Sequence, residues 1–501
     1  MMQSEANAQQ PSGLTVPGHR ANVQLPNGKI NAIGTGNRPG LNDTSVKGQD
    51  TGTVAAGMAT TPLSPSSSFT TSQLNSSQDL ISAVCFSYWD NILGPRIQHT
   101  WYASNHQPLH NSTLLHICSQ TLNGEICRDV ATSHVDYKFY TMPDKDIVVA
   151  GFIFSAKNVY GLGVHSLALV IPHKEMSRYL EKHELIHRWI FRLTGKLKVL
   201  LNKQDVAEKA LRKFTAYLTN LMLMLSSLQG FGLPRKIEIK DTTFSPSHNI
   251  ESEFIQKAIA SHLITLGRSV VVGKTPERIN LVISTLAMFN SPAERVCSRY
   301  VQKQVLLPYH QDLWLQGILV TSGDMLDIPT KEILCSKFPT TIVNITNRKI
   351  LQSPPCNVHN LRHHETVKDE LVCLHYGQTD EMTFPSMFQP ADYPETYISR
   401  LTKEINLLHP ACGVREAYIA QFMLFLHRKA LALIKYVEAE TNQGANSTKV
   451  HVKKLRADLN LTAEGDYRIV MAVAEKLKPG LYCYILGDRR HEAEQQINDN
   501  A

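Results

Sequence analysis

The pattern of apolar and polar positions separates a polar beginning from the rest of the chain. Residues 1–79 consist mainly of Gly, Ser, Thr, Pro, Asn and Gln, and Phe69 is the only Phe, Tyr or Trp among them. So little apolar surface cannot offset the entropy that an ordered backbone loses. We therefore predict that residues 1–79 are a disordered, low-complexity extension and that order begins at Leu80.

The next region, residues 80–230, alternates between strand and helix patterns. An apolar run rich in β-branched and aromatic side chains predicts a buried strand at 81–89. The turn-forming segment 90–95 then lets residues 96–102 return as an antiparallel partner. The remaining pattern predicts strands at 135–140, 147–154 and 166–171 and helices at 112–122, 174–202 and 205–227. Five antiparallel strands with helices on their faces make an α+β domain.

A different pattern begins at Glu251 and predicts an α/β domain over residues 250–400. Its centre is the short apolar run 269–273, which is typical of a strand buried on both faces. We expect Thr275 to cap the helix that Pro276 opens, and Ser291-Pro292-Ala293-Glu294 to form a capping box. Further elements are predicted at 254–266 and 277–289 (helices) and at 314–320 and 341–343 (strands). The Pro- and His-rich residues 351–400 predict loops and a helix.

Residues 401–487 are predicted to be mostly helical. Six apolar residues recur at steps of four and three and therefore share one helix face: Ile419, Met423, Leu426, Ala430, Leu433 and Val437. Phe422 and Phe425 widen that face, so we expect the helix to be buried on two sides.

The last elements follow this helix. We expect Thr462 to cap a second helix that runs through Leu477, where Pro and Gly end it. Residues 481–485 are expected to form a final strand, and residues 488–501 a polar tail.

Composition narrows the functional classes. The chain has 501 residues with 51 basic and 44 acidic side chains, and this small excess does not imply a nucleic-acid partner. Nine scattered cysteines without a Cys-x-x-Cys pair indicate a reduced, intracellular protein. No secretory signal is recognisable at the N-terminus. The uncharged stretch 214–234 carries too many polar side chains to span a bilayer, and it predicts a buried helix.

One motif suggests a zinc hydrolase. His183 and His187 flank Glu184 in a His-Glu-x-x-His pattern, which on a helix would place both imidazoles on one face. A third ligand is the difficulty, because Glu208 is the only well-spaced candidate. The apolar stripe of the same helix runs beside both histidines, so packed or surface histidines explain the motif better.

Three other segments are better explained as structure. Residues 267–275 imitate a phosphate-binding loop, but five residues separate the glycines and a strand occupies the loop. Cys356 with His359, His363 and His364 offers a single cysteine and predicts a flexible His-rich loop. The densest basic run is a solvated face or a contact for anionic lipid or an acidic partner: Lys449, Lys453, Lys454 and Arg456. We expect no catalytic, cofactor-binding or metal-binding residue.

Several long strings resemble a known family. The strings run collinearly from residue 81 to residue 487 and are highly specific for DENN proteins of the "chromosome 9 open reading frame 72" type. They are Phe86-Ser87-Tyr88-Trp89-Asp90-Asn91-Ile92-Leu93-Gly94-Pro95-Arg96, Thr121-Leu122-Asn123-Gly124-Glu125-Ile126, Ser269-Val270-Val271-Val272-Gly273, Ser291-Pro292-Ala293-Glu294-Arg295, Ala420-Gln421-Phe422 through Leu426-His427-Arg428-Lys429-Ala430-Leu431, and Leu461-Thr462-Ala463-Glu464-Gly465-Asp466.

The resemblance implies an architecture and a set of partners. It implies an upstream DENN (longin) domain at 80–230, a central DENN domain at 250–400 and a helical downstream DENN domain at 401–487. It also implies action on Rab- and Arf-type small GTPases, in complex with a second longin–DENN protein and a WD-repeat propeller protein. The implied setting is cytoplasmic, with recruitment to lysosomes, endosomes and autophagosomes and a peripheral contact with the lysosomal membrane.

Two functions follow from the resemblance and remain open at this point. The chain is either a guanine-nucleotide exchange factor subunit, which needs no covalent chemistry, or a non-catalytic scaffold of a GTPase-activating complex. In the second case the arginine finger is attributed to the partner chain, so no catalytic residue is carried over to this sequence. The third, unrelated hypothesis is the zinc hydrolase.

The opening hairpin is the candidate partner-binding site. Tyr88, Trp89 and Asp90 lie where the predicted strand gives way to the turn, so at least one large aromatic side chain is expected to reach the surface. Exposed Trp and Tyr dominate many protein interfaces. The alternative is a core Trp at the end of a strand.

Overall fold

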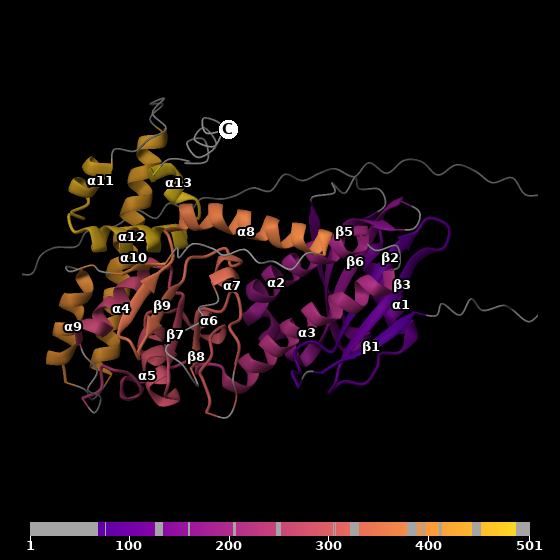
Figure 1. Cartoon of the computed structure of the whole chain (residues 1–501), viewed down its shortest axis with the longest axis horizontal. Coiled ribbons are helices and arrows are strands. Elements are labelled where there is room, and N and C mark those ends of the chain that lie inside the picture. Colours follow the sequence, from indigo (N-terminus) through magenta and orange to yellow (C-terminus); the bar gives the residue numbers. More distant parts are fainter. Residues whose placement is uncertain are drawn as a thin grey trace, which may run out of the picture. The chain divides into compact units, whose positions relative to one another are not determined.

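The computed structural model describes residues 69–486 with short gaps, and Figure 1 shows the described elements in colour. The internal gaps are residues 76, 126–133, 159–160, 204–206, 247–251, 304, 306, 321–329, 378–387, 392, 394–395, 410–412 and 443–451. The described residues form two β-sheets with helices around them. This mixed α and β architecture agrees with the expected fold class.

The first sheet has six strands in the order β1-β3-β2-β6-β5-β4. Five of them pair in antiparallel fashion, as expected. Their bounds are β2 (Ala83–Asp90), β3 (Gly94–Ala103), β4 (Val135–Met142), β5 (Ile147–Asn158) and β6 (Gly161–Pro172). The sixth strand, β1 (Thr70–Leu74), pairs in parallel with β3 at the edge of the sheet.

Strand β1 corrects the predicted start of order. The prediction placed residues 70–79 in a disordered extension, but Leu74 is buried and Gln78 fixes the chain by two hydrogen bonds with the backbone of Ile81 (2.7 and 2.8 Å). The polar sequence of β1 carries no apolar signal, because backbone pairing with β3 rather than side-chain burial holds most of it. Residues 1–68 lie outside the described residues.

Helices cover both faces of the first sheet. On one face, Val148, Phe152 and Phe154 of β5 pack against α2 (Met176–Lys203) and α3 (Ala207–Phe231). On the other face, Ile147 and Val149 pack toward α1 (Asn111–Leu122). Successive side chains of a strand point to opposite faces, so two covered faces explain why this strand is apolar at nearly every position.

The second sheet has five strands in the order β11-β10-β9-β7-β8. The central strand β7 (Ser269–Gly273) is fully buried and pairs in parallel with β8 (Leu315–Leu319) and β9 (Thr341–Asn344). Two further strands, β10 (Lys349–Gln352) and β11 (Gln389–Pro390), are antiparallel additions at one edge. The expected strands at 269–273, 314–320 and 341–343 are thus confirmed.

Helices α4 (Ser252–Ile264) and α5 (Pro276–Ala287) pack beside the second sheet, and the short helices α6 (Pro292–Val296) and α7 (Thr330–Leu334) follow. The capping box at the start of α6 is present, with both reciprocal hydrogen bonds between Ser291 and Glu294. Thr275 occupies the N-cap position of α5, but its side chain makes no capping hydrogen bond.

The helix expected within residues 351–400 is present, but it includes the His-rich segment for which we expected a flexible loop. Residues Cys356–Tyr376 form α8, which runs from the C-terminal helices toward α2 (Figure 1). The helix hides its periodicity because Cys356, His359 and Thr366 are its only fully buried residues. Its buried face therefore lacks the aliphatic stripe by which amphipathic helices are recognised.

The C-terminal helices share one hydrophobic core with α4 and α5. They are α9 (Tyr397–Leu407), α10 (Val414–Asn442), α11 (Val452–Asp458), α12 (Glu464–Leu477) and α13 (Leu481–Leu486). Two predictions at this end were wrong. The segment 481–485 is helical rather than a strand, and the N-cap of α12 is Ala463 rather than Thr462. The predicted tail at 488–501 lies outside the described residues.

Helix α10 is buried on one side only. Its predicted stripe faces the core, with Ile419, Leu426 and Leu433 almost completely buried. The opposite side is exposed, and Leu424 keeps 51% of its surface accessible. The expectation of burial on two sides is therefore wrong for the described residues. By length and composition alone α10 could also cross a membrane, but its stripe packs in the shared core.

Strand β1 should contribute measurably to stability. A protein that lacks residues 1–79 loses β1 and the buried Leu74, whereas one that lacks residues 1–68 keeps both. We expect the first truncation to melt at a temperature lower by about 5 °C or more than the second. Equal melting temperatures of the two truncated proteins, followed by circular dichroism, would show that β1 contributes nothing to the fold.

The one-sided burial of α10 can be tested with two neighbouring leucines. Leu426→Asp places a charge in the shared core and should lower the free energy of unfolding by several kcal/mol. Leu424→Asp, on the exposed side, should change that free energy by no more than about 0.5 kcal/mol. Urea denaturation compares both variants, and similar losses would mean that the described burial of α10 is incorrect.

Candidate functional site

The β2–β3 hairpin carries the three predicted partner-binding residues. Tyr88 and Trp89 are half-buried, and Trp89 packs against the core beneath α1. Asp90 closes the turn, because its Oδ1 accepts hydrogen bonds from the N–H groups of Leu93 (2.9 Å) and Ile92 (2.8 Å). These two bonds stabilise the carboxylate and lower the pKa of Asp90.

The tip of this hairpin presents two large apolar side chains to solvent. Ile92 is 92% exposed and Leu93 is 61% exposed. Leu162 of β6 is also exposed, at 66%, and the pairing of Tyr88 with His165 places it at the same end of the sheet. We call Ile92, Leu93 and Leu162 the apolar tip. A fixed turn that exposes apolar side chains suits protein binding better than catalysis.

Sequence reasoning missed the apolar tip. It placed Ile92 and Leu93 in the turn but assigned partner binding to the preceding aromatic residues. The signal that could have found them is the pair of large aliphatic residues inside a turn, where polar residues and Gly are usual. Trp89 fits both hypotheses, a partner-binding Trp and a core Trp, because its side chain packs partly in the core and is partly accessible.

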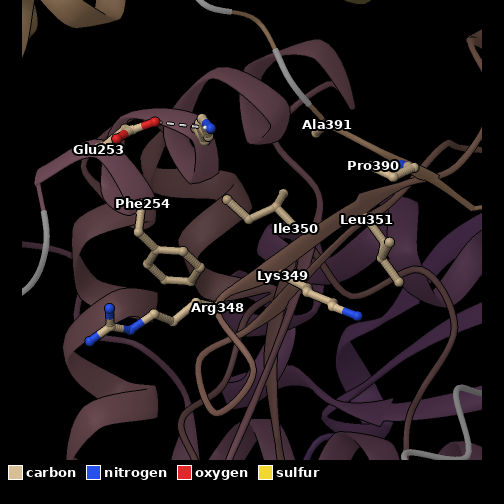
Figure 2. Close-up of a pocket in the computed structure, with 9 residues that line it drawn as sticks. Glu253, Phe254, Arg348, Lys349, Ile350, Leu351, Pro390 and Ala391 are labelled. Atoms are coloured by element: carbon tan, nitrogen blue, oxygen red, sulfur yellow. Dashed lines mark ion pairs between the residues drawn. The ribbon is translucent and has the colours of Figure 1, made fainter.

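A pocket of about 480 Å³ lies where α4 meets β10 and β11. Figure 2 shows the ring of Phe254 and the side chain of Ile350 facing one another across it, with Arg348 running beneath the ring. Glu253 at its rim is paired with Lys257 at 3.0 Å. The nine described residues that line it include no Ser, Thr, Cys or His, so they offer an apolar floor and a basic rim rather than a hydroxyl, thiol or imidazole.

The His-Glu-x-x-His motif lies on α2, and its side chains are engaged within the protein. His183 Nε2 lies 3.0 Å from the hydroxyl of Tyr137, and His187 packs edge-on against the same ring. Glu184 pairs with Arg188 at 2.6 Å, on the exposed side of the helix. The motif therefore anchors α2 to β4 through aromatic contacts.

The other two motifs also have structural roles. Residues 269–273 form β7, as the strand interpretation requires. On α8, His359 Nε2 lies 2.8 Å from the carbonyl oxygen of Ser336, and His363 Nδ1 lies 3.0 Å from that of Leu334. Among the described residues no three His, Cys, Asp or Glu side chains are placed to hold a metal ion.

The basic run is mostly neutralised by the protein itself. Arg456 bonds to Glu464 at 2.8 Å and to the carbonyl oxygen of Thr462, and Lys454 lies 3.6 Å from Glu440. Lys453 is exposed, and Lys449 lies outside the described residues. The described part of the run thus chiefly connects α11 to α10 and α12 through ion pairs.

Buried thiols are also unsuited to nucleophilic catalysis. Burial raises the pKa of Cys85 and of Cys335 to about 12, and that of Cys118 to about 11. The reactive form of a cysteine is the thiolate, which is scarce at neutral pH when the pKa is this high.

A buried ionic cluster joins α2 to the second sheet. The carboxylate of Asp312 pairs with Arg192 of α2 and accepts a hydrogen bond from Ser336 Oγ (2.8 Å). Arg268, which immediately precedes β7, donates to the backbone oxygen of Asp312 (2.8 Å), and its guanidinium lies over the rings of Trp314 and Phe338. We call Arg192, Arg268 and Asp312 the ionic cluster.

The charges in this cluster depend on one another. Burial alone would raise the pKa of Asp312, but the cations Arg192, Arg268 and Arg188 outweigh it and lower that pKa. Burial and the nearby Arg188 lower the pKa of Arg268 to about 10, which leaves it protonated at neutral pH. Removing the carboxylate would take the ion-pair partner from Arg192 and the largest favourable charge from the buried Arg268.

The ionic cluster should therefore be essential for stability. Asp312→Asn keeps the size of the side chain but removes its charge, and we expect a loss of about 3–5 kcal/mol in the free energy of unfolding. The control is Glu184→Gln, because the carboxylate of Glu184 is 79% exposed and its pair with Arg188 should contribute about 1 kcal/mol or less. Chemical denaturation measures both, and an Asp312→Asn protein of unchanged stability would contradict this account.

A family model and three related proteins all point to the same protein family. The model of the C9orf72-like protein family matches residues 116–359. The chain is similar to the human guanine nucleotide exchange factor C9orf72, with 32% identity over 461 residues that cover 85% of this chain and 95% of the human protein. The mouse and rat homologues of that protein are 31% identical over the same coverage.

Proposed function

The chain belongs to the C9orf72-like protein family, and from this premise we propose that it is a DENN-type regulator of Rab or Arf small GTPases. In this proposal it acts as a guanine-nucleotide exchange factor subunit in a complex that controls autophagy and endolysosomal traffic. The observation that carries the proposal is the similarity to proteins that are named guanine nucleotide exchange factors, which covers 95% of the length of those proteins.

The chemistry of the described residues is consistent with exchange. An exchange factor binds the nucleotide-free GTPase better than the nucleotide-bound form and thereby speeds GDP release, without forming or breaking covalent bonds. It needs a shaped surface on a firm support rather than a nucleophile. The apolar tip provides such a surface, because the hydrogen bonds of Asp90 fix its turn and the six-stranded sheet supports it.

The proposal includes an assignment of domains. Residues 80–230, with strand β1 in front, would be the upstream DENN (longin) domain, 250–400 the central DENN domain and 401–487 the downstream DENN domain. The two separate sheets and the C-terminal group of helices support this division. The single core shared by α4, α5 and the C-terminal helices suggests that the last two domains fold together.

We further propose the partners and location that the resemblance implies. They are a second longin–DENN protein, a WD-repeat propeller protein and a Rab- or Arf-type GTPase, and the location is cytoplasmic with recruitment to lysosomes, endosomes and autophagosomes. The apolar tip is our proposed contact with the GTPase or the longin–DENN partner, together with Tyr88, Trp89 and Asp90.

An exchange assay tests the function and the surface together. We expect the chain, alone or with its longin–DENN partner, to accelerate release of a fluorescent GDP analogue from a Rab or Arf GTPase. Ile92→Ser with Leu93→Ser should slow that release by about fivefold or more, because interface energy concentrates in such apolar anchors. Asp90→Ala should act in the same direction by loosening the turn.

The control is Leu180→Ser, which changes a half-exposed leucine on α2. It should leave GDP release unchanged. If the hairpin variants bind the GTPase and accelerate GDP release as well as the unmutated chain does, the apolar tip is not the contact. If GDP release is never accelerated but a partner's stimulation of GTP hydrolysis depends on this chain, the scaffold function holds instead of the exchange function.

A further inference from the structure

The exposed side of α10 is apolar where a surface helix is normally polar. A helix with apolar residues all round is typically buried on every side. In α10 the inner side lies in the shared core, while Leu424 and Leu431 on the outer side are 51% and 50% exposed. They lie seven residues apart, two helical turns, and therefore share one face.

From Ala417 to Val437 the helix contains no Asp or Glu, so the charges on this part of the face are basic. The next acid, Glu438, is paired with Lys478 at 2.7 Å. Arg428 and Lys435 are exposed on the same face as the two leucines, and no ion pair involves either of them among the described residues. We call Leu424, Arg428, Leu431 and Lys435 the outer stripe.

An aromatic groove lies on the α9 side of α10, about a quarter of a turn round the helix from the outer stripe. It is a hollow of about 280 Å³ between α9 and α10, lined by Tyr397, Arg400, Leu401, Glu404, Tyr418, Gln421, Phe422 and Phe425. Phe425 is 37% exposed and meets the ring of Tyr397 edge-on at 5.2 Å between centroids. Among the described residues of the lining the only acid is Glu404, which pairs with Arg400 at 2.8 Å.

We propose that the outer stripe and the α9–α10 groove bind an amphipathic helix of a partner protein whose apolar residues are flanked by Asp and Glu. The apolar anchors of such a helix would lie against Leu424 and Leu431 and reach into the groove, in the manner of a helix bound in a groove. Its acidic flank would meet Arg428 and Lys435. This surface is distinct from the apolar tip and does not depend on the exchange function.

Charge decides between this occupant and a second copy of the chain. A copy that used the same stripe would bring Arg428 and Lys435 against cations, and like charges across an interface oppose binding. A groove with aromatic walls also fits the ridge of a helix better than a flat lipid surface. An acidic amphipathic helix satisfies the apolar and the charged parts at once.

Two labelled helical peptides of about 18 residues test the proposal on the full chain. Both carry Leu at helical spacing, and one has Glu while the other has Lys at the flanking positions. Fluorescence anisotropy should show that the Glu peptide binds at least about tenfold more tightly than the Lys peptide. Leu424→Ser with Leu431→Ser should weaken binding by about tenfold or more, and Arg428→Glu with Lys435→Glu should reverse the preference.

The matched control is Leu223→Ser, which changes a leucine of α3 with 47% exposure and should leave peptide binding unchanged. The proposal is overturned if neither peptide binds, if both bind equally, or if the charge-reversed protein still prefers the Glu peptide. It is also overturned if phosphatidylserine vesicles bind through Leu424 and Leu431 while the Glu peptide does not, because a membrane would then be the occupant.

Discussion

The burial of Asp312 between Arg192 and Arg268 is the constraint on which the rest of the structure depends. An unpaired charge in a dry interior is so costly that the three residues hold one another in place. Arg192 belongs to α2, which covers the first sheet, and Arg268 leads into the central strand of the second sheet. Moving α2 away from β7 would expose both arginines and the carboxylate. We therefore expect the ionic cluster to couple the two sheets.

A firm support matters for the two exposed surfaces, the apolar tip and the outer stripe. A protein that promotes nucleotide release must hold its target in a shape the nucleotide does not favour, and a mobile surface would adapt to the target instead. The hairpin tip stands on the first sheet, and the outer stripe of α10 stands on the core shared with α4 and α5. His183 and the buried Cys85 take part in packing and hydrogen bonding around the first sheet.

Sequence reasoning recovered the elements whose physics is local. Local sequence is enough to predict the apolar, β-branched strands β2, β5 and β7 and the apolar stripe of α10, because burial requires those side chains at those spacings. It failed where other forces decide. Strand β1 is polar and held by its backbone, α8 buries a histidine rather than leucines, and α13 is too short for its period to be read. In the ionic cluster Asp312 lies 44 positions from Arg268 and 120 positions from Arg192 along the chain, so no local pattern predicts their contact.

Native-state hydrogen exchange, followed by mass spectrometry, tests most directly whether the two sheets are one body. The slowest amides of β5 and β6 report on the first sheet, and those of β7 and β9 report on the second. If the ionic cluster couples the sheets, both groups should exchange through the same global opening, with equal free energies and equal dependence on denaturant. If β5 and β6 remain protected under conditions in which β7 and β9 exchange freely, the sheets open independently and the account is contradicted.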